Sequence, residues 1–250
     1  TEKAKLEIQE KDRQTLLANL KKKQKGIQNE ISKKKRSAQQ LNAQIDRLIE
    51  IEIEKARKRA EEEARRKAAA AKAAEENKKS SGETASTSKS GVKTSGKKVA
   101  PVEKFNLNNE DHRLSGNFER NRGILPMPVT GPYVIVSHYG QYAVDGLRNV
   151  KLDNKGIDIK GKPGAKARAI FDGEVSAIFQ YNGLNNILVR HGNYISVYCN
   201  LSSVAVSKGS KVSTKTILGT IHTDSSGNSV LHFQLRKETA KLNPELWLGR

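Results

Sequence analysis

Apolar residues recur along the first fifty positions at alternating intervals of three and four. One series is Leu6, Arg13, Leu20, Ile27, Lys34, Leu41 and Leu48, and the other is Leu17, Gln24, Ile31, Ala38 and Ile45. This spacing places both series on one stripe of a helix that packs against a partner helix. Since no proline interrupts residues 1–78, we expect one long helix with a coiled-coil seam.

The apolar stripe ends near Leu48. From Glu50 to Glu76 the sequence is dominated by Glu, Arg, Lys and Ala, which are strong helix formers that pair along a helix face. This part should be a solvated helix, and the whole helix could be either a spacer or a docking element. Because the sequence starts within the helical pattern, without an initiating Met or a signal peptide, we expect a processed piece. Its helix would pack either against a second helix that precedes Thr1 or against another copy of itself.

Two segments connect this helix to the rest of the chain. Residues 79–104 are rich in Ser, Gly, Thr and Lys and predict a flexible linker. Residues 105–123 contain Leu114 and Phe118 four positions apart, which predicts a short amphipathic helix before Gly123. That helix could pack on the edge of the following domain, or it could cover a groove and restrain access to it.

The period of the pattern changes to two in residues 124–250. The expected strands are 133–137, 156–160, 167–171, 174–181, 186–191, 194–198, 216–222 and 230–236. Asp172-Gly173 and Gly192-Asn193 mark tight turns between strands. Many short strands with close turns indicate an antiparallel β-sheet, so the fold class is α plus mainly β.

Composition narrows the function only slightly. The formal net charge is +19, and residues 1–100 hold 27 basic and 15 acidic side chains. This excess fits a solvated lysine-rich helix or a surface for polyanions. No aromatic residue is interleaved with the lysines to stack on bases, so we expect no nucleic-acid partner. The single cysteine, Cys199, excludes an internal disulfide and a four-cysteine zinc site, and we expect a buried thiol.

Three short motifs carry candidate chemistry: Asn154-Lys155-Gly156-Ile157-Asp158, Tyr198-Cys199-Asn200-Leu201 and Val230-Leu231-His232. In order and spacing they resemble the LytM, or lysostaphin-like, family of zinc endopeptidases that cut peptidoglycan cross-links. That family carries His-x-Gly-x-Asp, a Tyr-Ala-His-Leu-like segment and His-x-His. The resemblance covers about half the chain and implies an antiparallel sheet domain of the duplicated hybrid motif type.

The resemblance assigns the zinc ligands to Asn154, Asp158 and His232, and the acid–base partners to Asn200 and Val230. An asparagine amide oxygen is a poor zinc donor, and neither Asn nor Val can move a proton. We therefore expect no metal cofactor, no catalytic residue and no enzymatic activity. His232 should instead be hydrogen-bonded to Asp158.

The whole arrangement, ending in Asn243-Pro244-Glu245-Leu246-Trp247-Leu248-Gly249-Arg250, resembles the EnvC family of murein hydrolase activators. That family implies a periplasmic protein at the division septum. Its coiled coil would dock on an FtsEX-like division transporter, and its degenerate domain would bind and activate N-acetylmuramyl-L-alanine amidases. The expected partner-binding groove consists of Lys155, Tyr198, Asn200, Val230, His232 and Arg236.

Two alternatives remain open at the level of sequence. Because Asp158 and His232 are retained, the domain could be a weakly active zinc endopeptidase with an unidentified third ligand. It could also be a passive cell-wall-binding module whose partner is peptidoglycan itself.

Overall fold

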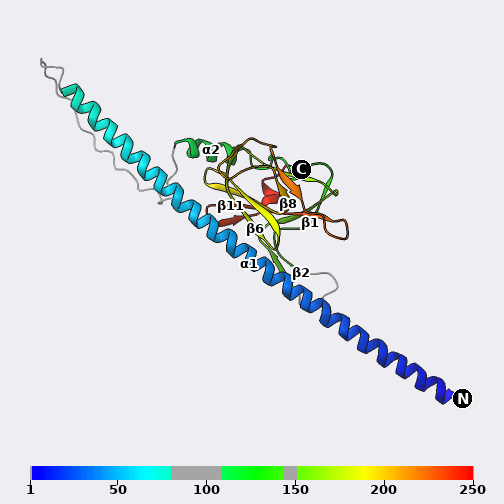
Figure 1. Cartoon of the computed structure of the whole chain (residues 1–250). Helices are drawn as coiled ribbons and strands as arrows, with labels where there is room; N and C mark the ends of the chain where they lie inside the picture. Colours follow the sequence, from blue (N-terminus) through cyan, green and yellow to red (C-terminus); the bar gives the residue numbers. More distant parts are fainter. Residues whose placement is uncertain (1, 80–108, 144–150, 250) are drawn as a thin grey trace. The chain divides into compact units, whose positions relative to one another are not determined.

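A computed structural model describes residues 2–79, 109–143 and 151–249 (Figure 1). Two compact units divide the chain, Thr1–Arg47 and Leu48–Arg250. The boundary between them falls within α1 (Glu2–Lys79), an uninterrupted helix that matches the predicted helix 1–78. The predicted linker 79–104 lies, except for Lys79, outside the described residues.

The prediction of a solvated helix after Glu50 is only partly correct. Glu52 and Ala56 are 6% and 5% exposed, and Glu52 lies 3.7 Å from the Arg190 guanidinium of the same unit. In the first unit, the seam residues Leu17, Leu20 and Ile27 are exposed. In the second unit, the exposed face of α1 carries four ion pairs with i,i+4 spacing: Arg57–Glu61, Lys58–Glu54, Arg66–Glu62 and Lys67–Glu63. Within the described parts of the chain, no helix has the length and apolar character needed to cross a membrane.

The second unit contains one large antiparallel sheet. Its main path runs in the order β1-β4-β11-β8-β7-β6-β9, with β10 pairing β5 and β8, and β12 pairing β11. A separate two-stranded sheet joins β2 and β3. The strands are β1 (Tyr133–Ser137), β2 (Gly140–Ala143), β3 (Lys151–Asn154), β4 (Ile157–Gly161), β5 (Lys166–Arg168), β6 (Gly173–Tyr181), β7 (Leu184–His191), β8 (Tyr194–Val204), β9 (Lys211–Val212), β10 (Ile217–Ile221), β11 (Ser229–Lys237) and β12 (Ala240–Leu242), followed by the 3-10 helix η1 (Pro244–Leu246).

The apolar core lies on one face of β4 and β11, where alternate residues are fully buried. On β4 these residues are Ile157 and Ile159, and on β11 they are Leu231, Phe233 and Leu235. Because side chains alternate between the two faces of a strand, Asp158 and His232 lie on the opposite face. The eight predicted strands are all present, and the antiparallel architecture is confirmed.

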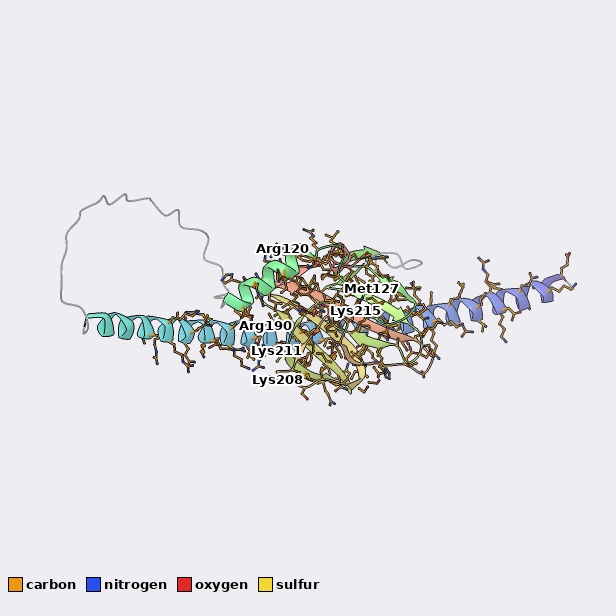
Figure 2. All side chains as sticks on the ribbon, turned by 90° about the horizontal axis from the view of Figure 1, so that it is seen from above. Arg120, Met127, Arg190, Lys208, Lys211 and Lys215 are labelled. Atoms are coloured by element: carbon orange, nitrogen blue, oxygen red, sulfur yellow. The ribbon has the colours of Figure 1, made fainter. Side chains whose placement is uncertain are left out.

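The predicted lead-in helix is α2 (Asn109–Arg120), and it packs on the turn between β7 and β8. Arg190 is labelled in Figure 2. Its guanidinium donates a hydrogen bond to Asp111 Oδ1 of α2 at 2.7 Å. Ser115 Oγ accepts one from the Asn193 amide at 2.9 Å. These contacts lie at the start of β8, whereas Asn200 lies six residues further along that strand, roughly 20 Å away. Helix α2 therefore packs on the edge of the domain.

Candidate functional site

Two neighbouring strands bring the retained polar residues together. Asp158 on β4 and His232 on β11 are direct partners in the antiparallel ladder. His232 Nδ1 lies 2.6 Å from Asp158 Oδ1, and both side chains are only partly exposed. The hydrogen bond that the sequence predicts between these two residues is therefore present.

Asn154, at the end of β3, joins the same cluster. Its Nδ2 donates to Asp158 Oδ2 at 3.3 Å, while its Oδ1 accepts from the Gly156 amide at 3.0 Å. Each carboxylate oxygen of Asp158 thus has a side-chain donor. The structure brings together the three positions to which the resemblance assigned ligands, but it connects them by hydrogen bonds.

Gln234 is a member of this cluster that the sequence analysis missed. Gln234 Nε2 lies 2.8 Å from His232 Nε2, and Arg236 donates from its terminal nitrogen to Gln234 Oε1 at 2.8 Å. A signal for Gln234 was available, since residues 232, 234 and 236 of a predicted strand must share one face.

Asn200 and Val230 extend the cluster toward β8. Asn200 adopts a left-handed conformation with φ 71°, and its Nδ2 donates to the Val230 carbonyl oxygen at 3.5 Å. Lys155, on the other side, pairs with Asp153 at 2.5 Å. We call the partly exposed residues of this region the remnant surface: Asn154, Lys155, Asp158, Asn200, Val230 and His232.

Two residues of the predicted groove are not available to a partner. Tyr198 is 0% exposed and lies in the core, where its hydroxyl accepts a hydrogen bond from the Ile170 amide at 3.0 Å. Burial raises the pKa of this hydroxyl. Arg236 is 1% exposed. Both predictions of partner contact need correction, because the strands that carry these residues are buried on both faces at these positions.

The neighbouring thiol is also inaccessible. Cys199 is fully buried, as predicted, and burial raises the pKa of its thiol. A buried thiol with a raised pKa is a poor nucleophile and a poor metal ligand.

The zinc that the LytM resemblance implies does not fit these residues. A tetrahedral zinc with donors at about 2.0–2.2 Å holds two of them roughly 3.3 Å apart. Asp158 and His232 are instead 2.6 Å apart in a direct hydrogen bond, and the Asn154 oxygen is engaged by Gly156. Across residues 2–79, 109–143 and 151–249, no group of three or more His, Cys, Asp or Glu side chains could hold a metal ion.

The sheet domain is similar to known proteins. Residues 153–244 match the family model described as Peptidase family M23. The murein hydrolase activator EnvC of Escherichia coli (strain K12) is 30% identical over 139 residues, which are 54% of this chain and 32% of that protein. The murein hydrolase activator NlpD of Salmonella dublin is 30% identical over 100 residues, 38% of this chain and 26% of that protein.

A mutant catalytic domain of the prophage-encoded M23 protein EnpA from Enterococcus faecalis is 24% identical, with a TM-score of 0.40. The match covers 49% of this chain and 95% of that one. The chain spans only about a quarter to a third of the length of the curated relatives that it matches. Residues 153–244 are thus similar to peptidase family M23, and this part of the chain is similar to EnvC and NlpD.

Proposed function

We propose that this chain is a non-catalytic activator of peptidoglycan amidases, acting in the periplasm during cell division and daughter-cell separation. The observation that carries the proposal is the direct pairing of Asp158 with His232 at 2.6 Å inside an M23 domain. A site closed by a hydrogen bond offers no open metal position for activating water. The names of EnvC and NlpD, murein hydrolase activators, support the same role.

The remnant surface is the proposed contact with an N-acetylmuramyl-L-alanine amidase. Val230 supplies an apolar contact, while Asn200 and Lys155 supply a neutral and a charged hydrogen-bonding group beside it. An amphipathic helix binds such a mixed surface through one apolar stripe and its polar borders. If this helix belongs to the amidase and inhibits it when unbound, binding to the remnant surface shifts the amidase toward its open state. The size of the shift equals the difference in the affinity of the remnant surface for the open and the inhibited amidase.

The exposed seam of α1 is the proposed contact with an FtsEX-like division transporter at the septum. Leu17, Leu20 and Ile27 leave an apolar stripe facing solvent in the first unit, and a helix with such a stripe gains stability by packing against another helix. Replacing Leu20 with glutamate should abolish copurification with the periplasmic part of the transporter while the domain's effect on an amidase persists. Undiminished copurification of that variant would contradict the assignment.

The central experiment is dye release from labelled peptidoglycan. The chain alone should release no dye, and adding it to an N-acetylmuramyl-L-alanine amidase should increase release. Val230→Asp should weaken this stimulation at least about tenfold, because burying an unpaired carboxylate in an interface is costly. Ile124→Asp is the matched control. Ile124 is also aliphatic, is exposed and lies in the segment that follows α2, outside the remnant surface. The I124D variant should therefore stimulate the amidase as the unaltered chain does.

Two outcomes would replace this proposal with another function. Dye release by the chain alone, abolished by a chelator, would indicate a zinc endopeptidase. Sedimentation with purified peptidoglycan, without stimulation of any amidase, would indicate a passive wall-binding module.

A further inference from the structure

A row of three polar side chains follows one face of β11 behind the remnant surface. His232, Gln234 and Arg236 alternate along the strand, and the last two are fully buried, at 0% and 1% exposure. Gln234 bridges the other two, with 2.8 Å from its Nε2 to His232 Nε2 and 2.8 Å from its Oε1 to the Arg236 guanidinium. With Asp158, they form a continuous chain of four hydrogen-bonded side chains.

The direction of every hydrogen bond in this chain follows from Arg236. A guanidinium only donates, so the Gln234 atom that faces it must be the oxygen. The Gln234 amide nitrogen therefore faces His232, and since it also only donates, His232 Nε2 must accept through its lone pair. The single proton of the neutral imidazole is then on Nδ1, 2.6 Å from Asp158 Oδ1, where it donates to the carboxylate.

We propose that Gln234, oriented by Arg236, is a positioning residue that holds His232 in its Nδ1–H tautomer and thereby excludes a divalent metal. The Nδ1 atom is the ring nitrogen that faces Asp158, and its lone pair is unavailable while it carries the proton. A metal-binding histidine has the reverse arrangement, with one nitrogen free for the metal and the other donating its proton to an acceptor. Gln234 offers His232 a donor where a metal site needs an acceptor.

This inference is independent of amidase activation, because it concerns only where the imidazole proton lies. Substitution of a ligand at Asn154 is one barrier to metal binding, and the polarity of the Asp158–His232–Gln234–Arg236 chain is a second one. Removing the first barrier alone should restore only a weak metal site.

Two substitutions separate these barriers. Asn154→His adds a third donor but leaves the tautomer of His232 unchanged. Gln234→Glu places a carboxylate acceptor opposite His232 Nε2, and the carboxylate retains Arg236 as its own donor partner. We expect N154H to bind zinc weakly, and N154H/Q234E to bind it about 10- to 100-fold more tightly, the usual effect of an outer-shell partner on metal affinity.

The test combines two measurements on the full chain. Nitrogen-15 NMR of the histidine rings in the unaltered protein shows directly which nitrogen of His232 carries the proton, and we expect Nδ1. Zinc titration calorimetry then compares N154H with N154H/Q234E. The matched control is N154H/Q180E, because Gln180 undergoes the same change at an exposed position on β6, and its zinc affinity should equal that of N154H.

Three results would overturn the proposal: a proton on Nε2 of His232 in the unaltered protein, equal zinc affinities of N154H and N154H/Q234E, or an equal gain from Q180E. The NMR result needs no substitution, so a variant that fails to fold would not leave the question open.

Discussion

Replacing Phe118 with alanine should lower the free energy of unfolding of the sheet domain by about 3 to 5 kcal/mol, the usual cost of deleting a buried aromatic ring. Phe118 on α2 is 0% exposed. Its ring stacks on His191 at 5.1 Å and on Tyr194 at 4.7 Å between centroids, and it meets Phe171 edge-on at 5.3 Å. Thermal unfolding should show a midpoint lowered by about 10 to 20 °C.

The control for this prediction is Arg113→Ala on the same helix. Arg113 is exposed, so its removal should change stability by less than about 0.5 kcal/mol. If F118A and R113A unfolded at the same temperature, α2 would not be part of the folded domain.

A second perturbation reaches the same contact from the sheet side. Gly192 has φ 73°, and a Cβ there would overlap Ser115 Oγ and the Asp111 carbonyl oxygen of α2. Gly183 has a similar φ of 78° but no atom within 4 Å of such a Cβ. G183A should therefore cost only the backbone penalty of about 1 kcal/mol, and G192A about 2 kcal/mol because α2 must also shift.

These variants also address the role of α2 in regulation. Helix α2 is held by a buried aromatic ring at the start of β8, so it is a structural part of the domain. A restraining helix, in contrast, must be able to leave the surface that it covers at a modest cost in free energy. At a temperature where F118A is still folded, its stimulation of an amidase should equal that of the unaltered chain. Increased stimulation by F118A would show that α2 does restrain the remnant surface.

The long elements could be predicted because each has a sustained period. The uninterrupted helical pattern of α1 and the alternation in β4 and β11 correspond closely to the observed elements. Short strands without alternation were missed, namely β2, β3, β9 and β12. In β2, for example, Gly140-Gln141-Tyr142-Ala143 contains no apolar repeat, and its pairing with β3 depends on chain topology that local sequence does not encode.

The second half of β8 was also missed. The predicted strand stopped at Tyr198, whereas β8 continues to Val204. The polar run that begins at Asn200 looks like a loop, and Asn200 has a left-handed φ of 71°. Pairing of Leu201, Ser203 and Val204 with β10 keeps this segment in the sheet, so tertiary contacts override the local signal.

The sequence was sufficient to predict which residues of the candidate site face each other across neighbouring strands. The motif order brought Asp158 and His232 together, and the ladder places them opposite one another. Exposure could not be predicted, because most of β7, the first half of β8 and the second half of β11 are buried on both faces. The family resemblance assigned Tyr198 and Arg236 to the contact surface, and alternation in sequence does not distinguish a groove wall from a core when both faces of a strand are buried.

Acidification should destabilise the domain through His191, which is buried at the end of β7. Its Nδ1 lies 2.7 Å from the Asp172 carbonyl oxygen and its Nε2 lies 2.8 Å from Ser196 Oγ. Burial lowers the pKa of His191 from the ordinary 6.5 to about 4; the Asp172 carbonyl opposes this effect, and the charge of Arg190 adds to it. At neutral pH the imidazole is therefore uncharged.

The sign of the pH effect follows from which state binds the proton. As the pH falls below 6.5, the unfolded chain protonates His191 while the folded domain does not, so the free energy of unfolding decreases. The decrease continues until the pH reaches about 4, where the folded domain also takes up the proton. Because each pKa unit corresponds to about 1.4 kcal/mol, the total loss is about 3 kcal/mol.

Urea unfolding of the unaltered chain, H191Q and H112Q at about pH 7, 6, 5 and 4 would measure this loss, because these values cover the range between the two pKa values of His191. His191→Gln removes the titrating ring, so its free energy of unfolding should start lower at neutral pH but fall less steeply with acidification. His112→Gln on the exposed face of α2 should retain the slope of the unaltered chain. Carboxylates contribute equally to all three curves, so the difference between the H191Q and H112Q slopes isolates His191; parallel curves would mean that His191 is protonated in the folded domain near its ordinary pKa.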